Sequence, residues 1–284
     1  MNILDDLKLQ YKTGGMVQKL IFWNIGCFLF SLVFFYSFSV GSFQIPTWIA
    51  LSSDFGTFIR TPWTLITFNF FHAGFLHLIF NLMVLHFSGR LFSTYFTDKQ
   101  LLGVYVLGGI FSGVTFVLSY IFIGKAGLLV GASGAIMAIL IATATYAPFM
   151  LLRIPLIGIV KLWHVAFVIL LVDLIQMPLD NTGGHLAHLG GALFGFIYIK
   201  LLQSGKDITK PFLALLDTFA NLFKPKKKTP FKKVHRNTTK KVVNSFTEKD
   251  ITQKQIDDIL DKISKSGYDS LTKEEKEFLF KAGK

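Results

Sequence analysis

Six apolar runs decide what this chain of 284 residues can fold into. A membrane span needs roughly 20 mostly apolar residues. The six runs are residues 18–40, 75–96, 101–123, 126–149, 155–177 and 185–203. Backbone within lipid must satisfy its own hydrogen bonds, so such spans are helices. The sequence therefore predicts an all-α, polytopic membrane protein: a bundle of six transmembrane helices with a helical tail.

The charged residues divide the chain into an apolar body and a basic tail. Charged residues make up only 16% of the sequence, against about 25% in a typical soluble domain. Most of the 29 Lys and Arg residues lie after residue 203. We expect a cytoplasmic N-terminal segment over 1–17, a membrane core over 18–203, a basic cytoplasmic linker over 204–245 and a small helical appendage over 246–284.

The Lys and Arg residues of the loops predict how the chain sits in the membrane. Alternate loops contain Lys8, Lys12, Lys19, Arg90, Lys99, Arg153 and the whole tail, whereas the loops between them contain only Arg60 and Lys125. Cytoplasmic loops are the ones enriched in positive charge. Both termini are therefore predicted to be cytoplasmic, and we expect the bacterial inner membrane as the location.

Small residues surround one serine and one histidine, in the fourth and sixth runs. Gly131 and Gly134 flank Ser133, where a tight turn before a helix would offer free backbone N–H groups to an oxyanion. Small residues recur every four positions in both runs: Gly134, Ala138 and Ala142, and Ala187, Gly191 and Gly195. Such faces let helices approach closely, which would bring His188 within hydrogen-bond reach of Ser133, the minimum for an activated serine. Plain helix packing with an incidental serine is the alternative.

Other polar residues at membrane depth are also candidates for a site. His77 and Asn81 are four apart on one helical face and could donate hydrogen bonds to an oxyanion; alone, the motif fits a structural pair better. Five histidines lie in or near the membrane: His72, His77, His86, His185 and His188. A metal site is the less favoured interpretation, because no carboxylate joins His185 and His188 except Asp173, in another span. We expect no metal and no cofactor.

Two isolated charges lie in the fifth run. Lys161 and Asp173 are each near an end of the run, so snorkelling or a structural bond explains them, and we assign them no catalytic role. No acidic residue near either histidine motif is expected to complete a Ser–His–Asp triad. A serine mechanism would therefore have to use a Ser–His dyad, without the acid of a triad.

In combination these motifs resemble the rhomboid family of intramembrane serine proteases. The resemblance covers about residues 63–195. It rests on His72…His77-x-x-x-Asn81, on Gly131-x-Ser133-Gly134 and on Ala187-His188-x-Gly190-Gly191-x-x-x-Gly195. It implies that Ser133 is the nucleophile and His188 the general base and acid. By the same resemblance, the backbone N–H of Ser133 with His77 and Asn81 would form the oxyanion hole.

The resemblance also assigns roles to two segments and shows two departures. Residues 41–74 would form a membrane-embedded loop, and the fifth span would be a lateral gate for substrates. Met137 stands where many members have a tyrosine that stacks on the base. Arg90 follows Gly89 where many members have a glutamate shortly after the glycine.

The resulting prediction is an intramembrane serine endopeptidase that cleaves single-span transmembrane proteins through an acyl-enzyme intermediate. Hydrolysis needs water, and Asn69, His72 and His185 are candidates to line a polar cavity. The alternative is a catalytically silent rhomboid-like protein that binds or escorts transmembrane helices. A transporter or channel would show internal repeats and more charges in the spans than this sequence has.

The tail has two predicted parts. The Lys224–Lys241 region is strongly basic and could attract anionic headgroups, at about 1 kcal/mol per Lys or Arg, or be a solvated linker. We expect no nucleic acid partner, because no fold signal accompanies the charge. An apolar stripe (Ile256, Ile259, Leu260, Ile263), a stop at Gly267 and a capping box from Thr272 to Glu275 predict a helical hairpin.

Overall fold

The computed structural model describes residues 2–124, 127–155, 157–178, 181–222 and 248–282. The chain forms two compact units, Met1–Lys224 and Pro225–Lys284. The helices of the first unit are α1 (Ile3–Thr13), α2 (Met16–Phe34), α3 (Phe55–Arg60), α4 (Thr64–Thr67), η1 (Phe68–Phe70), α5 (Phe75–Ser93), α6 (Asp98–Ile123), α7 (Ser133–Tyr146), α8 (Leu162–Gln176), α9 (Thr182–Gln203) and α10 (Thr209–Leu222). Its strands are β1 (Tyr36–Ser37), β2 (Ser42–Phe43), β3 (Leu51–Ser52), β4 (Leu128–Leu129), β5 (Leu151–Ile154) and β6 (Gly158–Lys161).

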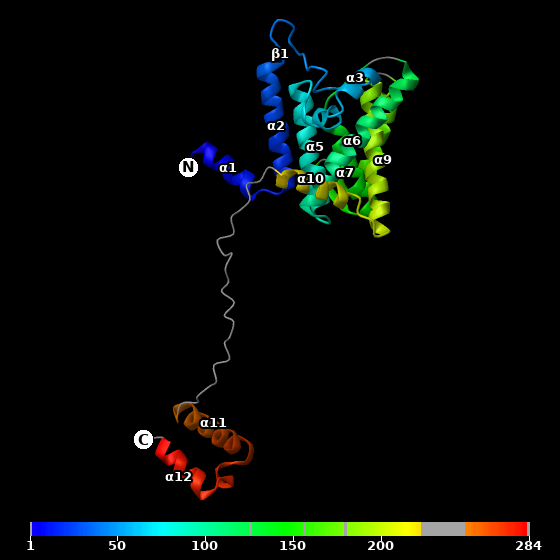
Figure 1. Cartoon of the computed structure of the whole chain (residues 1–284). Coiled ribbons are helices and arrows are strands. Elements are labelled where there is room, and N and C mark those ends of the chain that lie inside the picture. Colours follow the sequence, from blue (N-terminus) through cyan, green and yellow to red (C-terminus); the bar gives the residue numbers. More distant parts are fainter. Residues whose placement is uncertain (1, 125–126, 156, 179–180, 223–247, 283–284) are drawn as a thin grey trace. The chain divides into compact units, whose positions relative to one another are not determined.

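Helix α7 forms the centre of the first unit. It packs against α5, α6, α8 and α9, with which it forms the bundle in Figure 1. Every residue from 134 to 144 is buried, as expected of a helix that is apolar on all sides. Its neighbours surround it with large buried side chains that include Leu85, Tyr105 and Tyr198. Whatever lies at the first residue of α7 is therefore held by the best-packed part of the molecule.

The predicted count of six spans is not confirmed. Four helices are long and apolar enough to cross a membrane: Met16–Phe34, Phe75–Ser93, Asp98–Phe122 and Thr182–Gln203. The helices in the fourth and fifth runs, α7 and α8, have only 14 and 15 residues. At 1.5 Å per residue they are about 21 and 22 Å long, short of a hydrocarbon core of about 30 Å. Within the described residues, the first unit is a membrane bundle with four candidate spans and two shorter apolar helices.

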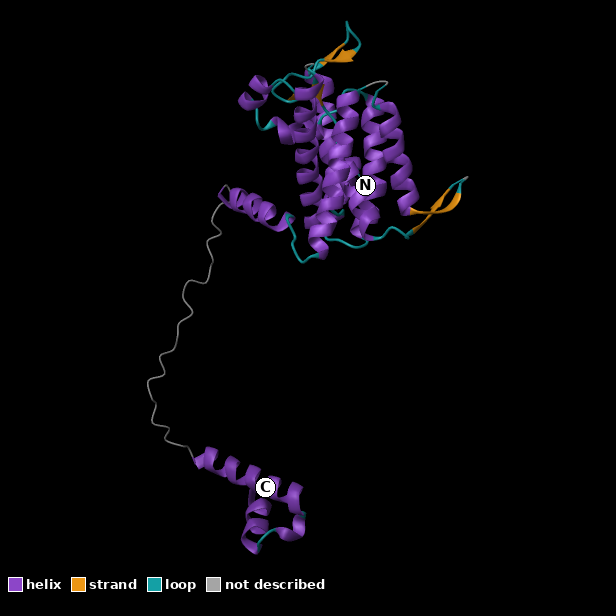
Figure 2. Ribbon diagram, turned by 90° about the vertical axis from the view of Figure 1, so that its right-hand side faces the viewer, coloured by secondary structure: helices purple, strands orange, loops and turns teal. Residues whose placement is uncertain are grey.

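The fifth run starts within a hairpin, which the all-α prediction did not include: β5 lies just before the run and β6 lies inside it. Strands β5 and β6 pair antiparallel, with Leu151 opposite Lys161, and project from one end of the bundle (Figure 2). Gly158 has a φ of +101°, a conformation that side chains other than glycine rarely adopt. Proline and glycine therefore end the helical pattern, and α8 starts only at Leu162.

The loop before α7 is fastened to the segment that follows α2. Strand β3 pairs with β4, with Leu51 opposite Leu129. The hydroxyl of Ser53 accepts a hydrogen bond of 2.7 Å from the backbone N–H of Gly127. Further on, the backbone N–H of Gly131 donates to the carbonyl oxygen of Phe68 at 2.9 Å. These bonds fix the chain as it enters α7.

The second unit is a small helical hairpin of α11 (Glu248–Ser266), η2 (Tyr268–Ser270) and α12 (Lys273–Ala282). Gly267, at a φ of +80°, ends α11 as predicted. The capping box is confirmed, since the Thr272 N–H donates to Glu275 at 2.8 Å and the Glu275 N–H donates to the Thr272 hydroxyl at 3.3 Å. Ile259 is buried, but Leu260 of the same predicted stripe is half exposed. The basic Lys224–Lys241 region lies outside the described residues.

We expect acid to loosen this hairpin. The Lys262 ammonium, which donates to Glu275 at 2.8 Å, and the Thr272 N–H hold the pKa of the Glu275 carboxyl below its ordinary value of 4.5. A carboxyl with a lowered pKa stabilises the fold above its unfolded pKa, and that contribution is lost as the pH falls below about 4.5. The protection factors of the amides of residues 248–282 in the full chain, which correct hydrogen exchange for its intrinsic dependence on pH, should fall over this range, and Glu275→Gln should remove the step. The control Glu277→Gln changes an exposed carboxyl and should keep it.

Candidate functional site

Ser133 is the first residue of α7, and the turn before it depends on a glycine. Gly131 has a φ of +136°. A Cβ built on Gly131 would lie 2.9 Å from the imidazole of His77. Only a residue without a side chain fits between the loop and α5 at this point. The turn therefore places Ser133 beside His77 at the end of the buried helix.

The small-residue faces of α7 and α9 are in direct contact. A Cβ on Gly191 would overlap the carbonyl oxygen of Gly134, and one on Gly195 would overlap the carbonyl oxygen of Ala138. A Cβ on Gly134 would overlap the Ser112 hydroxyl of α6. The predicted close approach of the two helices is confirmed, and it is an approach of backbone to backbone.

This approach brings Ser133 and His188 together. The Nε2 atom of His188 lies 2.6 Å from the Ser133 hydroxyl oxygen. The predicted juxtaposition is thus present, while the catalytic roles of the two residues stay a prediction. The side chain of His188 is 23% exposed, so the pair is accessible from one side.

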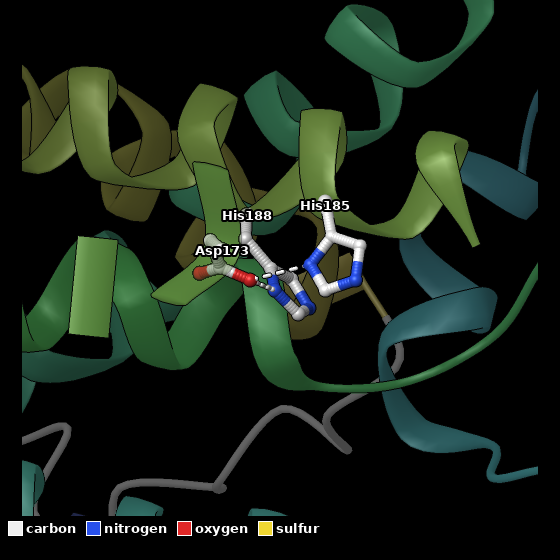
Figure 3. A group of neighbouring side chains, drawn as sticks. All are labelled: Asp173, His185 and His188. Carbon is white, nitrogen blue, oxygen red and sulfur yellow. Dashed lines mark hydrogen bonds and ion pairs between the residues drawn. The ribbon is translucent and has the colours of Figure 1, made fainter. Parts of the chain in front are cut away.

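Asp173 completes a row of three side chains, Ser133–His188–Asp173, called the polar row below. This corrects the sequence-based prediction that His188 has no acidic partner. The Oδ1 atom of Asp173 lies 2.9 Å from Nδ1 of His188 and 2.6 Å from Nδ1 of His185. Figure 3 shows both imidazoles converging on this carboxylate. The prediction of a dyad without an acidic partner was wrong, because α8 packs against α9 and carries its one carboxylate inward. Snorkelling does not describe a side chain that is only 10% exposed.

The hydrogen-bond chemistry of the row follows from the carboxylate. An ionised carboxylate only accepts hydrogen bonds, so Nδ1 of His188 carries the proton in this arrangement. Its Nε2 atom then has a free lone pair facing the Ser133 hydroxyl. The hydroxyl donates to a ring nitrogen that could accept its proton, which is the arrangement required of an activated nucleophile.

The row opens into a cavity of about 490 Å³ between α5, α7, α8 and α9. Its walls are mostly apolar, with the polar row at one end. The lining residues are His77, Phe80, Asn81, Val84, Leu129, Val130, Ser133, Ile136, Met137, Val168, Ile169, Val172, Asp173, Asn181, Gly184 and His188. Phe80, Val168 and Val172 are also exposed on the outer surface of the bundle, at 58%, 54% and 44%. The cavity is therefore open at the side of the bundle, between α5 and α8.

The remaining predicted site residues divide between the cavity and the interior. His77 and Asn81 line the cavity, as an oxyanion site requires, although the Asn81 amide already donates to the His77 carbonyl at 2.8 Å. Asn69 and His72 are buried and do not line it. His185 is also not among the lining residues, because its ring turns to Asp173.

The first unit is a membrane bundle whose cavity holds a serine, an imidazole and a carboxylate. These features define an integral membrane protein with a serine-centred polar site, and the comparison with known families agrees. Residues 60–204, just over half of the chain, match the rhomboid domain. The chain belongs to the rhomboid family. Residues 243–281 match a family of unknown function (DUF6576).

Curated relatives are similar to this chain over just under half of its length. Presenilin-associated rhomboid-like protein A, mitochondrial, from Danio rerio is 34% identical over 137 residues, which cover 46% of this chain and 35% of the relative. The human presenilin-associated rhomboid-like protein, mitochondrial, is 31% identical over 143 residues, 49% of this chain and 37% of the relative. The chain thus spans about a third of the length of the curated relatives it matches.

These findings correct the predicted function. The relatives above are named as rhomboid-like proteins and not as proteases, and the predicted dyad mechanism excluded the carboxylate that Asp173 supplies. The alternative, a rhomboid-like protein that binds or escorts transmembrane helices, fits better than the predicted dyad endopeptidase, which is withdrawn. The relatives' names describe them as mitochondrial, so they give no support to the expected bacterial inner membrane.

Proposed function

We propose that this chain binds a transmembrane helix of another membrane protein, in the cavity between α5 and α8. The single observation that carries the proposal is the sideways opening of that cavity. Its apolar walls are continuous with the outer face of the bundle through Phe80, Val168 and Val172. An apolar segment could enter from lipid without crossing water.

Helix α8 is the wall best suited to move aside. Only Leu162, Ala166 and Asp173 of its 15 residues are buried. Elements with few buried apolar contacts open at low free-energy cost. Helix α8 is attached to α9 partly by the contacts of Asp173 with His185 and His188. A helix that displaced α8 would therefore remove the carboxylate from the polar row. An incoming helix with small residues would approach this row most closely.

Disulfide trapping with a defined partner tests the proposal. The only cysteine, Cys27, is removed by Cys27→Ser, and Val168→Cys places a thiol at the opening. The partner is a synthetic single-span peptide with one cysteine, placed at successive depths, reconstituted with the full chain in lipid vesicles. We expect crosslinking at Val168→Cys that peaks at one depth and is competed by a cysteine-free copy of the peptide.

The matched control is Leu118→Cys on α6, which is as exposed to lipid, at 52% against 54%, but does not line the cavity. Random collision in the bilayer would crosslink both positions alike. Equal, depth-independent yields at Val168→Cys and Leu118→Cys would reject helix binding in the cavity and leave lipid chains as its occupant.

A second candidate, called the hydrolase candidate below, is separate from the withdrawn endopeptidase prediction: Ser133 is a reactive nucleophile, with His188 as its base. The specific observation in its favour is the three-membered row Ser133–His188–Asp173, which a protein that only binds helices does not need. His77 and Asn81, with the N–H of Ser133, would hold the oxyanion. A fluorophosphonate probe that labels the wild type but not Ser133→Ala would support this candidate, and failure to label Ser133 would count against it.

For the orientation, we propose that both termini face the cytoplasmic side or its equivalent. Support comes from the loop charges: Arg60 lies before the candidate span α5, and Arg90 and Lys99 lie at or beyond its C-terminal end, so a spanning α5 would separate them. Accessibility of single cysteines to an impermeant maleimide on intact and opened vesicles measures this directly.

A further inference from the structure

The carboxylate of Asp173 is shared by two imidazoles, whereas a serine nucleophile needs only one imidazole as its base. Its Oδ1 atom receives Nδ1 of His188 at 2.9 Å and Nδ1 of His185 at 2.6 Å. The second imidazole has no chemical role in either function proposed above, where it serves only to attach α8 to α9. Since His185 and His188 are three residues apart in α9, they lie on the same face of that helix.

We propose that Asp173, His185 and His188 bind a divalent transition-metal ion, with Zn²⁺ as the best match. Two imidazole nitrogens and one carboxylate oxygen form a donor set that suits Zn²⁺ and leaves a fourth position open. The three ligand atoms all lie within 4.8 Å of one another. Calcium and magnesium prefer oxygen ligands, so the same residues disfavour them.

The change needed to admit the ion is small. With bonds of about 2.0–2.2 Å, the ligand atoms of a tetrahedral zinc site lie about 3.3–3.6 Å apart. The present separations of 2.6 and 2.9 Å would each widen by less than about 1 Å. The side chains of His185, Asp173 and His188 are 12%, 10% and 23% exposed, and Asp173 and His188 line the cavity, from which an ion can reach the carboxylate that all three share.

The site has a consequence for Ser133, which rests on the second proposed function. A metal on Nδ1 of His188 replaces the proton there. The remaining proton of the neutral ring is then on Nε2, the atom that faces the Ser133 hydroxyl at 2.6 Å. A nitrogen that carries a proton cannot accept one from the hydroxyl. Metal binding would therefore switch Ser133 off without displacing it.

Metal binding is measured on the full chain in detergent micelles, without reference to activity. Titration with Co²⁺, followed by visible absorption and competed by Zn²⁺, should show one tetrahedral site. His185→Asn should weaken binding at least about tenfold, since removing a ligand costs no less than removing its outer-shell partner. The matched control is His164→Asn, an exposed histidine at the other end of α8, which should leave affinity unchanged.

X-ray absorption of the zinc-loaded wild type gives a second measurement that does not depend on a variant folding. Two imidazoles in the first shell are expected, and a shell made of oxygen alone would overturn the site. Equal Co²⁺ affinity in wild type and His185→Asn would overturn it as well. If Ser133 is never labelled by the fluorophosphonate, the hydrolase candidate fails while the metal result stands. If it is labelled, Zn²⁺ should suppress labelling in the wild type and lose this effect in His185→Asn.

Discussion

Replacing Gly191 with valine should unfold or severely destabilise the membrane unit. A Cβ at this position would overlap the carbonyl oxygen of Gly134, and that atom belongs to the backbone of the central helix. No flexible side chain can move aside, so α7 and α9 must separate along their whole contact. Overpacking a core typically costs 1–3 kcal/mol, and we expect a loss of at least about 3 kcal/mol here because two backbones are forced apart. The midpoint of thermal unfolding in detergent micelles measures the effect.

The matched control for this substitution is Gly26→Val in α2. A Cβ on Gly26 meets nothing within 4 Å, so the same change of residue should alter stability by less than about 0.5 kcal/mol. Similar unfolding midpoints for the two variants would contradict the view that backbone contact between α7 and α9 holds the unit together. The comparison also bears on the site, because the same contact sets the distance between Ser133 and His188.

The sequence predicts this contact well, because its signal is local and periodic. Gly134 and Ala138 on one helix, and Gly191 and Gly195 on the other, recur every four residues, and the structure brings these faces together. The family follows from the same residues, since their order and spacing are distinctive. The helix lengths are harder to predict. Composition cannot distinguish an apolar strand from an apolar helix, so Gly158–Lys161 was assigned to the fifth span although it pairs with Leu151–Ile154 in a hairpin.

Asp173 is the part of the site that stands out in the sequence as a charge within an apolar run, although the sequence analysis assigned it no catalytic role. It is the sole acidic residue in the six apolar runs. A carboxylate at membrane depth is functional by default, which was reason enough to seek its partner. Spacing within one helix could not show that partner, because α8 and α9 meet only in the folded bundle. The pairing of Asp173 with His188 is a tertiary contact between two helices.

Replacing Asp173 with asparagine should reduce the labelling of Ser133 by a fluorophosphonate about 10³–10⁴-fold, if the hydrolase candidate holds. The carboxylate accepts a hydrogen bond from the Nδ1–H of His188 at 2.9 Å and so leaves Nε2 unprotonated for the hydroxyl. An asparagine amide can donate to Nδ1 instead, which favours the opposite tautomer with a proton on Nε2. Asparagine has nearly the shape of aspartate, so the packing of α8 against α9 should persist. The measurement is the second-order rate constant of labelling, with unfolding midpoints recorded alongside.

Asp217→Asn is the matched control, because Asp217 is 67% exposed and pairs only loosely with Lys99, at 3.7 Å. It should label at the wild-type rate. Labelling of Asp173→Asn at the wild-type rate would show that the carboxylate is structural, and that Ser133 and His188 suffice by themselves.

A wild type that is never labelled, yet still traps a helix at Val168→Cys, would assign the cavity to helix binding alone. The polar row would then act as a latch between α8 and α9, held by two imidazoles on one carboxylate.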